Sequence, residues 1–382
     1  MGTVQKFAAD RLFTGQEILE GGQVLVMNHS NEVEAIINRE EAGDNVQDLS
    51  GLLCPGFVNA HCHLELSHMK GKIPPGKGMT DFLLQVMNTR GETDEVKEEA
   101  MKMAEEEMYR NGIVAVGDIC NTTDSFMLKK TSPLYYHNFI EVAGFVPATA
   151  AKRLEAAMQV YDRSVTVPGA HSIAPHAPYS VSPELFELIA ALRPAVTTLH
   201  NQESEAETEF FVSKTGSLLK IYEQLGVDLS FFHATGKSSL RSVASHFKNL
   251  GSLLLVHNCF TGEEDIETLK QETVNTAISF CVCPNANNYI GNPLPRMDLL
   301  IKSGMNICVG TDSLASNTQL NIWEEIKTIR KHFPHIPLQT LLQWATSNGA
   351  AALNISDRFG SFKKGTTPGV LLIGDDGAKR VF

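Results

Sequence analysis

A repeated pattern between residues 52 and 313 constrains the fold of this chain more than any other feature. Short apolar runs alternate there with polar or Gly/Pro breaks and helical patterns, as in repeated βα units. The runs that fit strands are residues 56–60, 113–119, 134–142, 171–175, 196–199, 253–256, 278–283 and 306–310. Eight such units favour an α/β fold of the (β/α)8 TIM-like barrel type, which needs about 250 residues. An open doubly wound sheet is the alternative, but no G-x-G-x-x-G follows the first run.

The two ends of the chain depart from this repeat. Short alternating runs occupy residues 22–28 and 32–38, and the pattern returns at residues 369–373. Neither end can make a core alone, and chain termini often lie close together. We therefore expect residues 1–53 and 360–382 to form a small β-sandwich domain beside a catalytic barrel at residues 54–359.

Three segments of the barrel region give further local predictions. Residues 93–110 are rich in Glu, Met and Ala and are followed by Asn111-Gly112, which predicts a helix ending at residue 110. The sequence Thr261-Gly262-Glu263-Glu264 predicts a capping box that opens a helix over 263–270. Residues 205–246 are more than one crossover helix needs, so we expect an extra element or lid there.

Charge and composition exclude several classes of function. The 32 Lys and Arg residues against 44 Asp and Glu give a net charge of -12, the wrong sign for a surface that tracks nucleic-acid phosphates. No apolar run is long enough to span a membrane, and the sequence MGTVQKFAAD carries no export signal, which predicts a cytoplasmic protein. The seven cysteines lie mostly in apolar stretches, so we expect buried, reduced thiols.

An H-x-H pair follows the first predicted strand. Residues two apart on a strand point the same way, so His61 and His63 can bind one metal ion together. His200, His257 and Asp312 close the fifth, sixth and eighth predicted strands. In a barrel the carboxyl ends of the strands meet at one face, where active sites are assembled. Imidazole and carboxylate ligands suit Zn²⁺ or Fe²⁺, so the pattern predicts a metal centre with a position left for water.

Two carboxylates near this centre have candidate catalytic roles. Asp312 could accept a proton from water that the metal activates, because a metal lowers the pKa of bound water to about 7. Glu203 stands three residues after His200 and could protonate a ring nitrogen of a substrate. The alternative for Glu203 is that it begins an acidic helix face with the three alternate glutamates that follow it.

The other histidines and cysteines carry weaker signals. His176 lies between two prolines just past the fourth run, which suits either a positioned substrate contact or a surface turn. Cys281 and Cys283 share one side of a strand, but no second Cys pair accompanies them, so we expect core packing and no zinc there. The histidines expected to be structural or solvated are His29, His68, His137, His171, His246, His332 and His335.

An ordered set of motifs resembles the amidohydrolase superfamily over nearly the whole chain. The motifs are PGFVNAHCH, HAPYS, HNQE, VHN, CPNAN and GTDSLASN. The set is most similar to the deaminase and chlorohydrolase branch, which includes adenosylhomocysteine/methylthioadenosine deaminases, guanine deaminase and aminodeoxyfutalosine deaminase. The resemblance implies a distorted (β/α)8 barrel with a small β-sandwich. The sequence His61-Cys62-His63-Leu64-Glu65-Leu66-Ser67, with Arg90 ending the next helix, looks most like the aminodeoxyfutalosine deaminase variant.

Carried over residue by residue, the resemblance implies that His61, His63, His200 and Asp312 bind one metal ion, with zinc expected and iron the alternative. Many members of the superfamily bridge two metals with a carboxylated lysine at the end of strand four. No lysine occurs between Lys152 and Lys214, which argues for a mononuclear site.

The resemblance also implies roles around the metal. Glu203 would be the proton shuttle, His257 would polarise the attacked group or hold the water, and His176 would contact the substrate. Arg90 is expected to contact the substrate as well. The segment 231–237 matches no motif of the family, and we expect it to bring His233 or Lys237 to the mouth of the pocket.

The expected reaction is hydrolytic deamination of an aminated N-heterocycle, such as an adenosine derivative or aminodeoxyfutalosine, with release of ammonia. The alternative within enzymes is hydrolysis of an amide, a cyclic imide or a C–Cl bond by the same mononuclear metal centre. A non-catalytic binding protein would have a broken ligand set, but every ligand type is present here. The expected partner is a small-molecule substrate, and family analogy suggests a homodimer.

Overall fold

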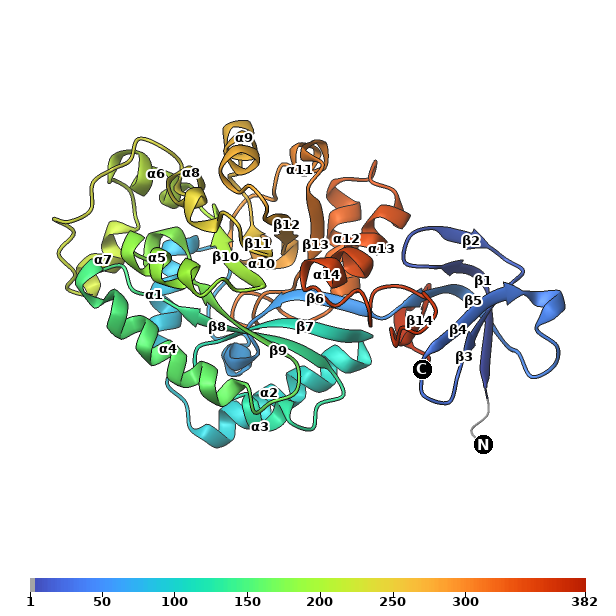
Figure 1. Ribbon diagram of the computed structural model, residues 1–382. Coiled ribbons are helices and arrows are strands. Elements are labelled where there is room, and N and C mark those ends of the chain that lie inside the picture. The colour runs from blue at the N-terminus through green and yellow to red at the C-terminus, as the bar shows by residue number, and fades with distance from the viewer. Residues whose placement is uncertain (1–3) are drawn as a thin grey trace.

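The computed structural model describes residues 4–382, and it shows an α/β body with a β-sheet at one end (Figure 1). Residues 1–3, which the predicted terminal domain includes, lie outside the described part of the chain. None of the helices between residues 4 and 382 has the length and apolar character that crossing a membrane requires.

The strands of the α/β body follow one another in chain order. Within residues 4–382 they form two four-stranded parallel sheets. The first contains β6 (Phe57–Cys62), β7 (Ile113–Cys120), β8 (Tyr135–Val142) and β9 (Ala170–Pro175). The second contains β10 (Val196–Asn201), β11 (Ser252–His257), β12 (Ala277–Val282) and β13 (Asn306–Val309). Each strand overlaps one predicted run, so the predicted βα repeat is confirmed.

Local contacts join the two parallel sheets at both of their edges. Between β9 and β10, the amide of His200 donates a hydrogen bond of 2.9 Å to the carbonyl of His176. Between β13 and β6, Cys62 and Asp312 form an isolated parallel bridge, and the amide of Asp312 lies 3.1 Å from the carbonyl of His61. These contacts bring the carboxyl ends of distant strands to one place.

The strands of the body are apolar because both of their faces are covered, as is usual for parallel sheets. Every residue of β11 is buried, for example. The strands also approach each other closely beside the predicted ligands. A Cβ on Gly310 would lie 2.8 Å from the Cβ of His61 and 2.9 Å from the sulfur of Cys281. Glycine is therefore required at position 310 if β6 and the end of β13 are to meet.

Helices connect and surround these strands (Figure 1). The α-helices are α1 (Met79–Thr89), α2 (Asp94–Arg110), α3 (Phe126–Lys129), α4 (Ala150–Ser164), α5 (Pro183–Ala191), α6 (Glu205–Ser213), α7 (Leu219–Gln224), α8 (Ser239–Val243), α9 (Glu263–Glu272), α10 (Pro284–Ile290), α11 (Met297–Ser303), α12 (Ile322–His332), α13 (Leu338–Ala345) and α14 (Ser347–Ala352). The 3-10 helices are η1 (Arg39–Glu41), η2 (Leu64–Met69), η3 (Pro147–Thr149), η4 (Pro178–Ser180) and η5 (Ala244–Phe247). Helices α6, α7 and α8 lie within residues 205–246, where an extra element was expected.

The ends of two helices test the predicted caps. Helix α2 ends at Arg110 as predicted, and the side chain of Thr93 caps its start. Helix α9 begins at Glu263, but the capping box predicted at Thr261 is wrong by one residue. Gly262 is the N-cap, and its amide donates to the carboxylate of Asp265 at 2.8 Å. The hydroxyl of Thr261 donates instead to the side-chain oxygen of Gln202, at 2.7 Å.

The two ends of the chain pair with each other in the sheet beside the body (Figure 1). Its strands are β1 (Gln5–Phe13), β2 (Ile18–Glu20), β3 (Gln23–Met27), β4 (Val33–Asn38), β5 (Gln47–Pro55), β14 (Val370–Gly374) and β15 (Gly377–Arg380). Strand β14 runs antiparallel to β5, with Val370 opposite Pro55. The predicted pairing of the termini is thus found. The predicted β-sandwich is not confirmed, because the pairing joins these seven strands into one sheet.

Candidate active site

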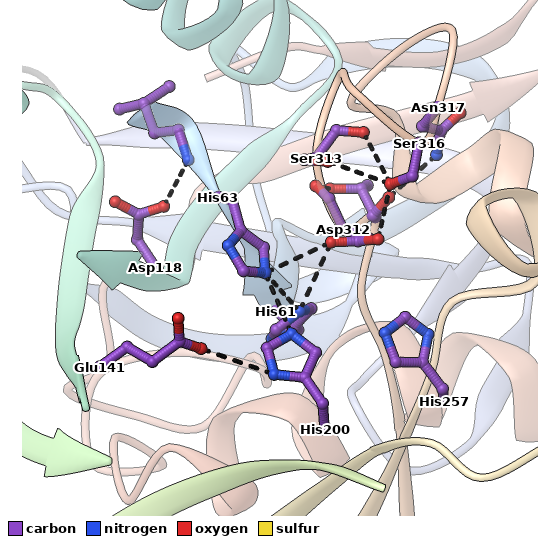
Figure 2. A network of polar contacts seen from close by, with 12 residues as sticks. His61, His63, Asp118, Glu141, His200, His257, Asp312, Ser313, Ser316 and Asn317 are labelled. Atoms are coloured by element: carbon purple, nitrogen blue, oxygen red, sulfur yellow. Dashed lines mark hydrogen bonds and ion pairs between the residues drawn. The ribbon is translucent and has the colours of Figure 1, made fainter. Parts of the chain in front are cut away.

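Three imidazole rings meet at the carboxyl ends of the strands (Figure 2). His61 lies on β6, His63 follows that strand directly, and His200 lies on β10. The Nε2 atom of His63 is 3.2 Å from Nε2 of His61 and 3.2 Å from Nε2 of His200. All three side chains are buried. The arrangement brings together the three predicted histidine ligands.

Asp312 adds a carboxylate to the three rings (Figure 2). Its Oδ1 lies 3.6 Å from Nε2 of His61 and 3.4 Å from Nε2 of His63. Its φ of 58° is in the left-handed region, a strain that surrounding contacts must hold. One such contact is the hydroxyl of Ser316, which donates to Oδ2 at 2.6 Å. Burial raises the pKa of Asp312, but the hydrogen bond with His61 and the charges of the histidines outweigh it, so the pKa lies well below its ordinary value.

These four side chains fit one divalent cation. His61, His63 and His200 offer nitrogen atoms that lie within 4.8 Å of one another. The Nδ1 of His200 donates to the carbonyl of His176 at 2.9 Å, which leaves the lone pair of Nε2 free to bind a metal. Burial lowers the pKa of His63 to about 4, so this ring is neutral at pH 7. Neutral imidazoles grouped with a carboxylate match the ligand preferences of Zn²⁺ and Fe²⁺.

Glu203 and His257 lie beside the four candidate ligands. Oε1 of Glu203 is 3.6 Å from Nε2 of His257, and both side chains are almost fully buried. Nδ1 of His257 donates to Oδ1 of Asn287 on α10 at 2.9 Å, which fixes the imidazole and leaves Nε2 as the acceptor. Burial, then the charges of Asp312 and Glu207, raises the pKa of Glu203 well above its ordinary value. The arrangement suits a carboxyl group that holds a proton near neutral pH.

A buried ion pair supports the segment that carries the H-x-H pair. Asp118, on β7, accepts a hydrogen bond of 2.8 Å from the amide of Leu64, directly after His63. Lys129, on α3, pairs with Asp118 at 2.5 Å, and both side chains are fully buried. Lys129 also donates to Oδ1 of Asn138 at 2.8 Å. The ammonium group is thus committed to structural contacts.

Glu141, on β8, contacts the candidate ligand His200 from the other side (Figure 2). Its Oε1 lies 3.5 Å from Nδ1 of His200. Its Oε2 accepts a hydrogen bond of 2.8 Å from Asn121, whose own side-chain oxygen accepts one of 3.0 Å from Arg90. These contacts connect a guanidinium group in the cavity wall with a candidate metal ligand.

Three of the four candidate ligands, His63, His200 and Asp312, line a cavity of about 410 Å³. His176 and Arg90, two of the predicted substrate contacts, line this cavity. His233 is not among the residues that line this cavity, and its predicted position at the pocket mouth stays a prediction. Its side chain is exposed, because the loop after α7 runs over the surface there. Lys237, on the same loop, is exposed as well.

Several residues that hold the site were missed by the sequence reasoning. Asn287 belongs to the motif CPNAN and Ser316 to the motif GTDSLASN. The motifs therefore pointed to these residues, but they did not indicate what the side chains do. Asp118, Lys129 and Glu141 had no such signal, because charged residues on a strand end or a short helix are normally solvated. Only their burial beside the histidines reveals them.

The structure also shows where other histidines and the cysteines lie. Cys281 and Cys283 are fully buried in the core, as predicted. The seven cysteines are free and buried in the described part of the chain. His68 and His137 are buried with hydrogen bonds to Glu65 and Ser172, and His335 pairs with an aspartate at the surface.

Comparisons with known proteins agree with this geometry. The family model described as "Amidohydrolase family" matches residues 52–373. The chain is 26% identical to an adenosine deaminase of Helicobacter pylori, over 81% of this chain and 76% of that protein. It is also 26% identical to an aminodeoxyfutalosine deaminase of a Nitratiruptor species, over 86% of this chain and 79% of that protein.

The fold is similar to a solved structure as well. That structure is Helicobacter pylori aminofutalosine deaminase in complex with methylthio-coformycin, with a TM-score of 0.82 and 23% identity. The alignment covers 97% of this chain and 92% of that one. Because the family model spans most of the chain and the candidate ligands lie within it, this protein belongs to the amidohydrolase family.

Proposed function

We propose that this protein is a metal-dependent deaminase that hydrolyses the amino group of an N-heterocycle in a nucleoside-like substrate and releases ammonia. The observation that carries the proposal is the convergence of three imidazoles, one carboxylate and a buried glutamate with a raised pKa beside one cavity. The names of the relatives support the same chemistry.

The four candidate ligands would supply the nucleophile. His61, His63, His200 and Asp312 would hold one Zn²⁺ or Fe²⁺ ion, which lowers the pKa of water and so makes hydroxide available near neutral pH. We favour zinc, because catalytic zinc sites are commonly built from imidazole and carboxylate ligands with a position left for water.

The neighbouring residues would move the protons. Glu203 donates its proton to the ring nitrogen next to the attacked carbon, which makes that carbon more electrophilic. His257 accepts a hydrogen bond at Nε2 and so orients the attacking water. Asp312 passes one proton of the water to the departing amine, and the other proton returns to Glu203 as the attacked carbon becomes a carbonyl. A C–O bond forms, the C–N bond breaks and ammonia leaves.

The cavity wall supports a substrate with an apolar arm. Away from the histidines it is mostly apolar, lined by Leu66, Met79, Phe82, Leu83, Val86, Phe145, Ile221 and Tyr222. Arg90 and Arg153 also line it. Guanidinium groups pair well with carboxylates. We infer that the substrate is a nucleoside whose arm packs on the apolar wall and carries an anionic group toward Arg90 and Arg153, with His176 contacting the part nearer the metal.

An ammonia assay tests the reaction. The purified protein, with its metal content measured, is incubated with adenosine, 5′-methylthioadenosine, S-adenosylhomocysteine and aminodeoxyfutalosine, and with atrazine as a chlorohydrolase substrate. We expect ammonia from at least one nucleoside, and the variant Arg90→Gln should raise KM only for substrates with an anionic arm. Chloride release or ring opening without ammonia would favour the alternative reaction.

The contacts between the two parallel sheets also support a proposal about the architecture of the chain. The hydrogen bonds across both sheet edges favour a closed (β/α)8 barrel over residues 54–359, with residues 1–53 and 360–382 as the accompanying domain. A homodimer and a cytoplasmic location stay predictions.

A further inference from the structure

A buried glutamate outside the cavity contacts two parts of the site at once. Glu325 lies on α12, its side chain has no exposed surface, and it is not among the residues that line the cavity. It belongs to none of the motifs on which the family resemblance rests. A carboxylate without solvent contact needs partners that offset the loss of hydration.

The first contact of Glu325 reaches the segment that carries Asp312. Its Oε1 accepts a hydrogen bond of 2.9 Å from the side-chain amide of Asn317. The same amide nitrogen donates to the carbonyl of Thr311 at 2.9 Å. Thr311 precedes Asp312 directly, so this contact holds the turn in which Asp312 adopts its left-handed backbone.

The second contact of Glu325 reaches the helix that orients His257. Its Oε2 accepts a hydrogen bond of 2.9 Å from the backbone amide of Asn285 in the first turn of α10. Two residues further along the same turn, Asn287 accepts the hydrogen bond from Nδ1 of His257. The carboxylate therefore fixes the start of the helix that supplies this acceptor.

Through Asn317 and Asn285, the two contacts support the two residues that are proposed to bind or orient the water. Asp312 is a candidate ligand and proton acceptor, and His257 is the residue expected to orient the water. Glu325 contacts both supporting segments, with Oε1 on Asn317 and Oε2 on Asn285. Loss of its carboxylate would remove one of the two acceptors of the Asn317 amide and the acceptor of the Asn285 backbone amide.

We propose that Glu325 is a positioning residue that keeps Asp312 and His257 in register with each other across β11 and β13. Its link to the reaction rests on the proposed function, but its link to the metal ligand can be measured without turnover. Partners that orient metal ligands typically change metal affinity or activity by about 10–100-fold when they are removed.

The experiment compares Glu325→Leu and Glu325→Gln with the control Glu324→Gln. Glu324 is the preceding residue on α12, and its partly exposed carboxylate pairs with Lys327. Zinc-loaded proteins are mixed with excess chelator, and the rate of zinc loss is followed. Steady-state kinetics with the best nucleoside and thermal melting are measured on the same preparations.

We expect zinc loss about 10–100-fold faster in Glu325→Leu. Glu325→Gln, which keeps one acceptor, should lie between that variant and the wild type, and Glu324→Gln should match the wild type. The loss of activity should appear in kcat, with KM nearly unchanged, because Glu325 does not reach the cavity. Glu325→Gln preserves the volume of the side chain, so it serves if Glu325→Leu does not fold.

A second test asks whether Glu325 acts through Asn317. The effects of Asn317→Ala and Glu325→Gln on zinc loss should be less than additive in the double variant, since both remove one contact. If zinc loss and kcat stay within twofold of the wild type in both Glu325 variants, even with a lower melting temperature, the proposal is overturned. A wild type that releases no ammonia would refute the proposed function alone, because zinc loss still reports on Glu325.

Discussion

Oε1 of Glu203, in the loop after β10, lies 3.6 Å from Nε2 of His257 at the end of β11. Because Nδ1 of His257 already donates to Asn287, the Nε2 atom faces Glu203 as an acceptor. A proton carried by Glu203 therefore has the imidazole on one side and the cavity on the other. Neither residue is a candidate metal ligand, so the role proposed for this pair is proton transfer and not metal binding.

Replacement of Glu203 should separate these two properties. We expect Glu203→Gln to lower kcat by about 10²–10⁴-fold, because general acid catalysis is lost, while the zinc content stays that of the wild type. Ammonia release and metal analysis on one preparation measure both. The control is Glu205→Gln, an exposed carboxylate two residues away, which should keep full activity.

Replacement of His61 should abolish metal binding. His61→Ala removes one of three converging nitrogen atoms, so we expect less than a tenth of the wild-type zinc content and no detectable ammonia release. His335→Ala, at an exposed histidine that pairs with Asp298, is the matched control. Full turnover by a metal-free His61→Ala protein would contradict the mechanism.

Removal of the metal should also lower stability. A metal that binds only the folded state stabilises it by mass action, by about 4 kcal/mol at a thousandfold excess over its Kd. Dialysis against a chelator should therefore lower the melting temperature, and added zinc should restore it. In His61→Ala the chelator should have no effect on the melting temperature.

The buried ion pair of Asp118 and Lys129 should dominate the stability of the region under the H-x-H pair. Lys129→Met leaves the carboxylate of Asp118 buried without its partner, which should cost about 3–5 kcal/mol. The double variant Lys129→Met/Asp118→Asn should recover part of this loss. Lys97→Met, at a partly exposed pair with Asp124, should cost less than about 1 kcal/mol in the same denaturant titration.

The buried carboxyl of Glu207 should give a measurable pH dependence. Burial raises its pKa from 4.5 to about 7. Between these values the folded state holds more protons on Glu207 than the unfolded state does, so its contribution to stability falls as the pH rises. The full difference is about 3 kcal/mol. Denaturant titrations of the wild type should show this decline. In Glu207→Gln the decline should be smaller by this amount but not absent, because burial also raises the pKa values of Glu65 and Glu325. Glu209→Gln, at an exposed site, should match the wild type.

The sequence predicted the strands well because covered parallel strands read as uninterrupted apolar runs. The ends of the strands were less certain, since His61 and Cys62 continue β6 beyond the predicted end at residue 60. The cap of α9 was shifted because Thr261 makes a tertiary contact with Gln202 that no local pattern reveals. His233 lies in a segment that matches no motif of the family, and its side chain is exposed.

The candidate ligands were predictable because each stands at the end of a strand, where the fold concentrates its side chains. What the sequence could not provide is the set of contacts that hold them. Asn287, Ser316 and Glu325 act through tertiary hydrogen bonds between segments that are distant in the chain. Local periodicity carries no information on such pairs.

The pairing of β14 with β5 has a consequence for synthesis of the protein. Strand β5 leads through Gly56 into β6, the strand that carries His61, yet its neighbour β14 lies close to the C-terminus. During synthesis, one edge of β5 lacks its native partner until residues 370–374 have been made, after all the strands from β6 to β13. An unpaired strand edge is a template for pairing with another chain, so the incomplete protein carries a site for wrong association at this edge.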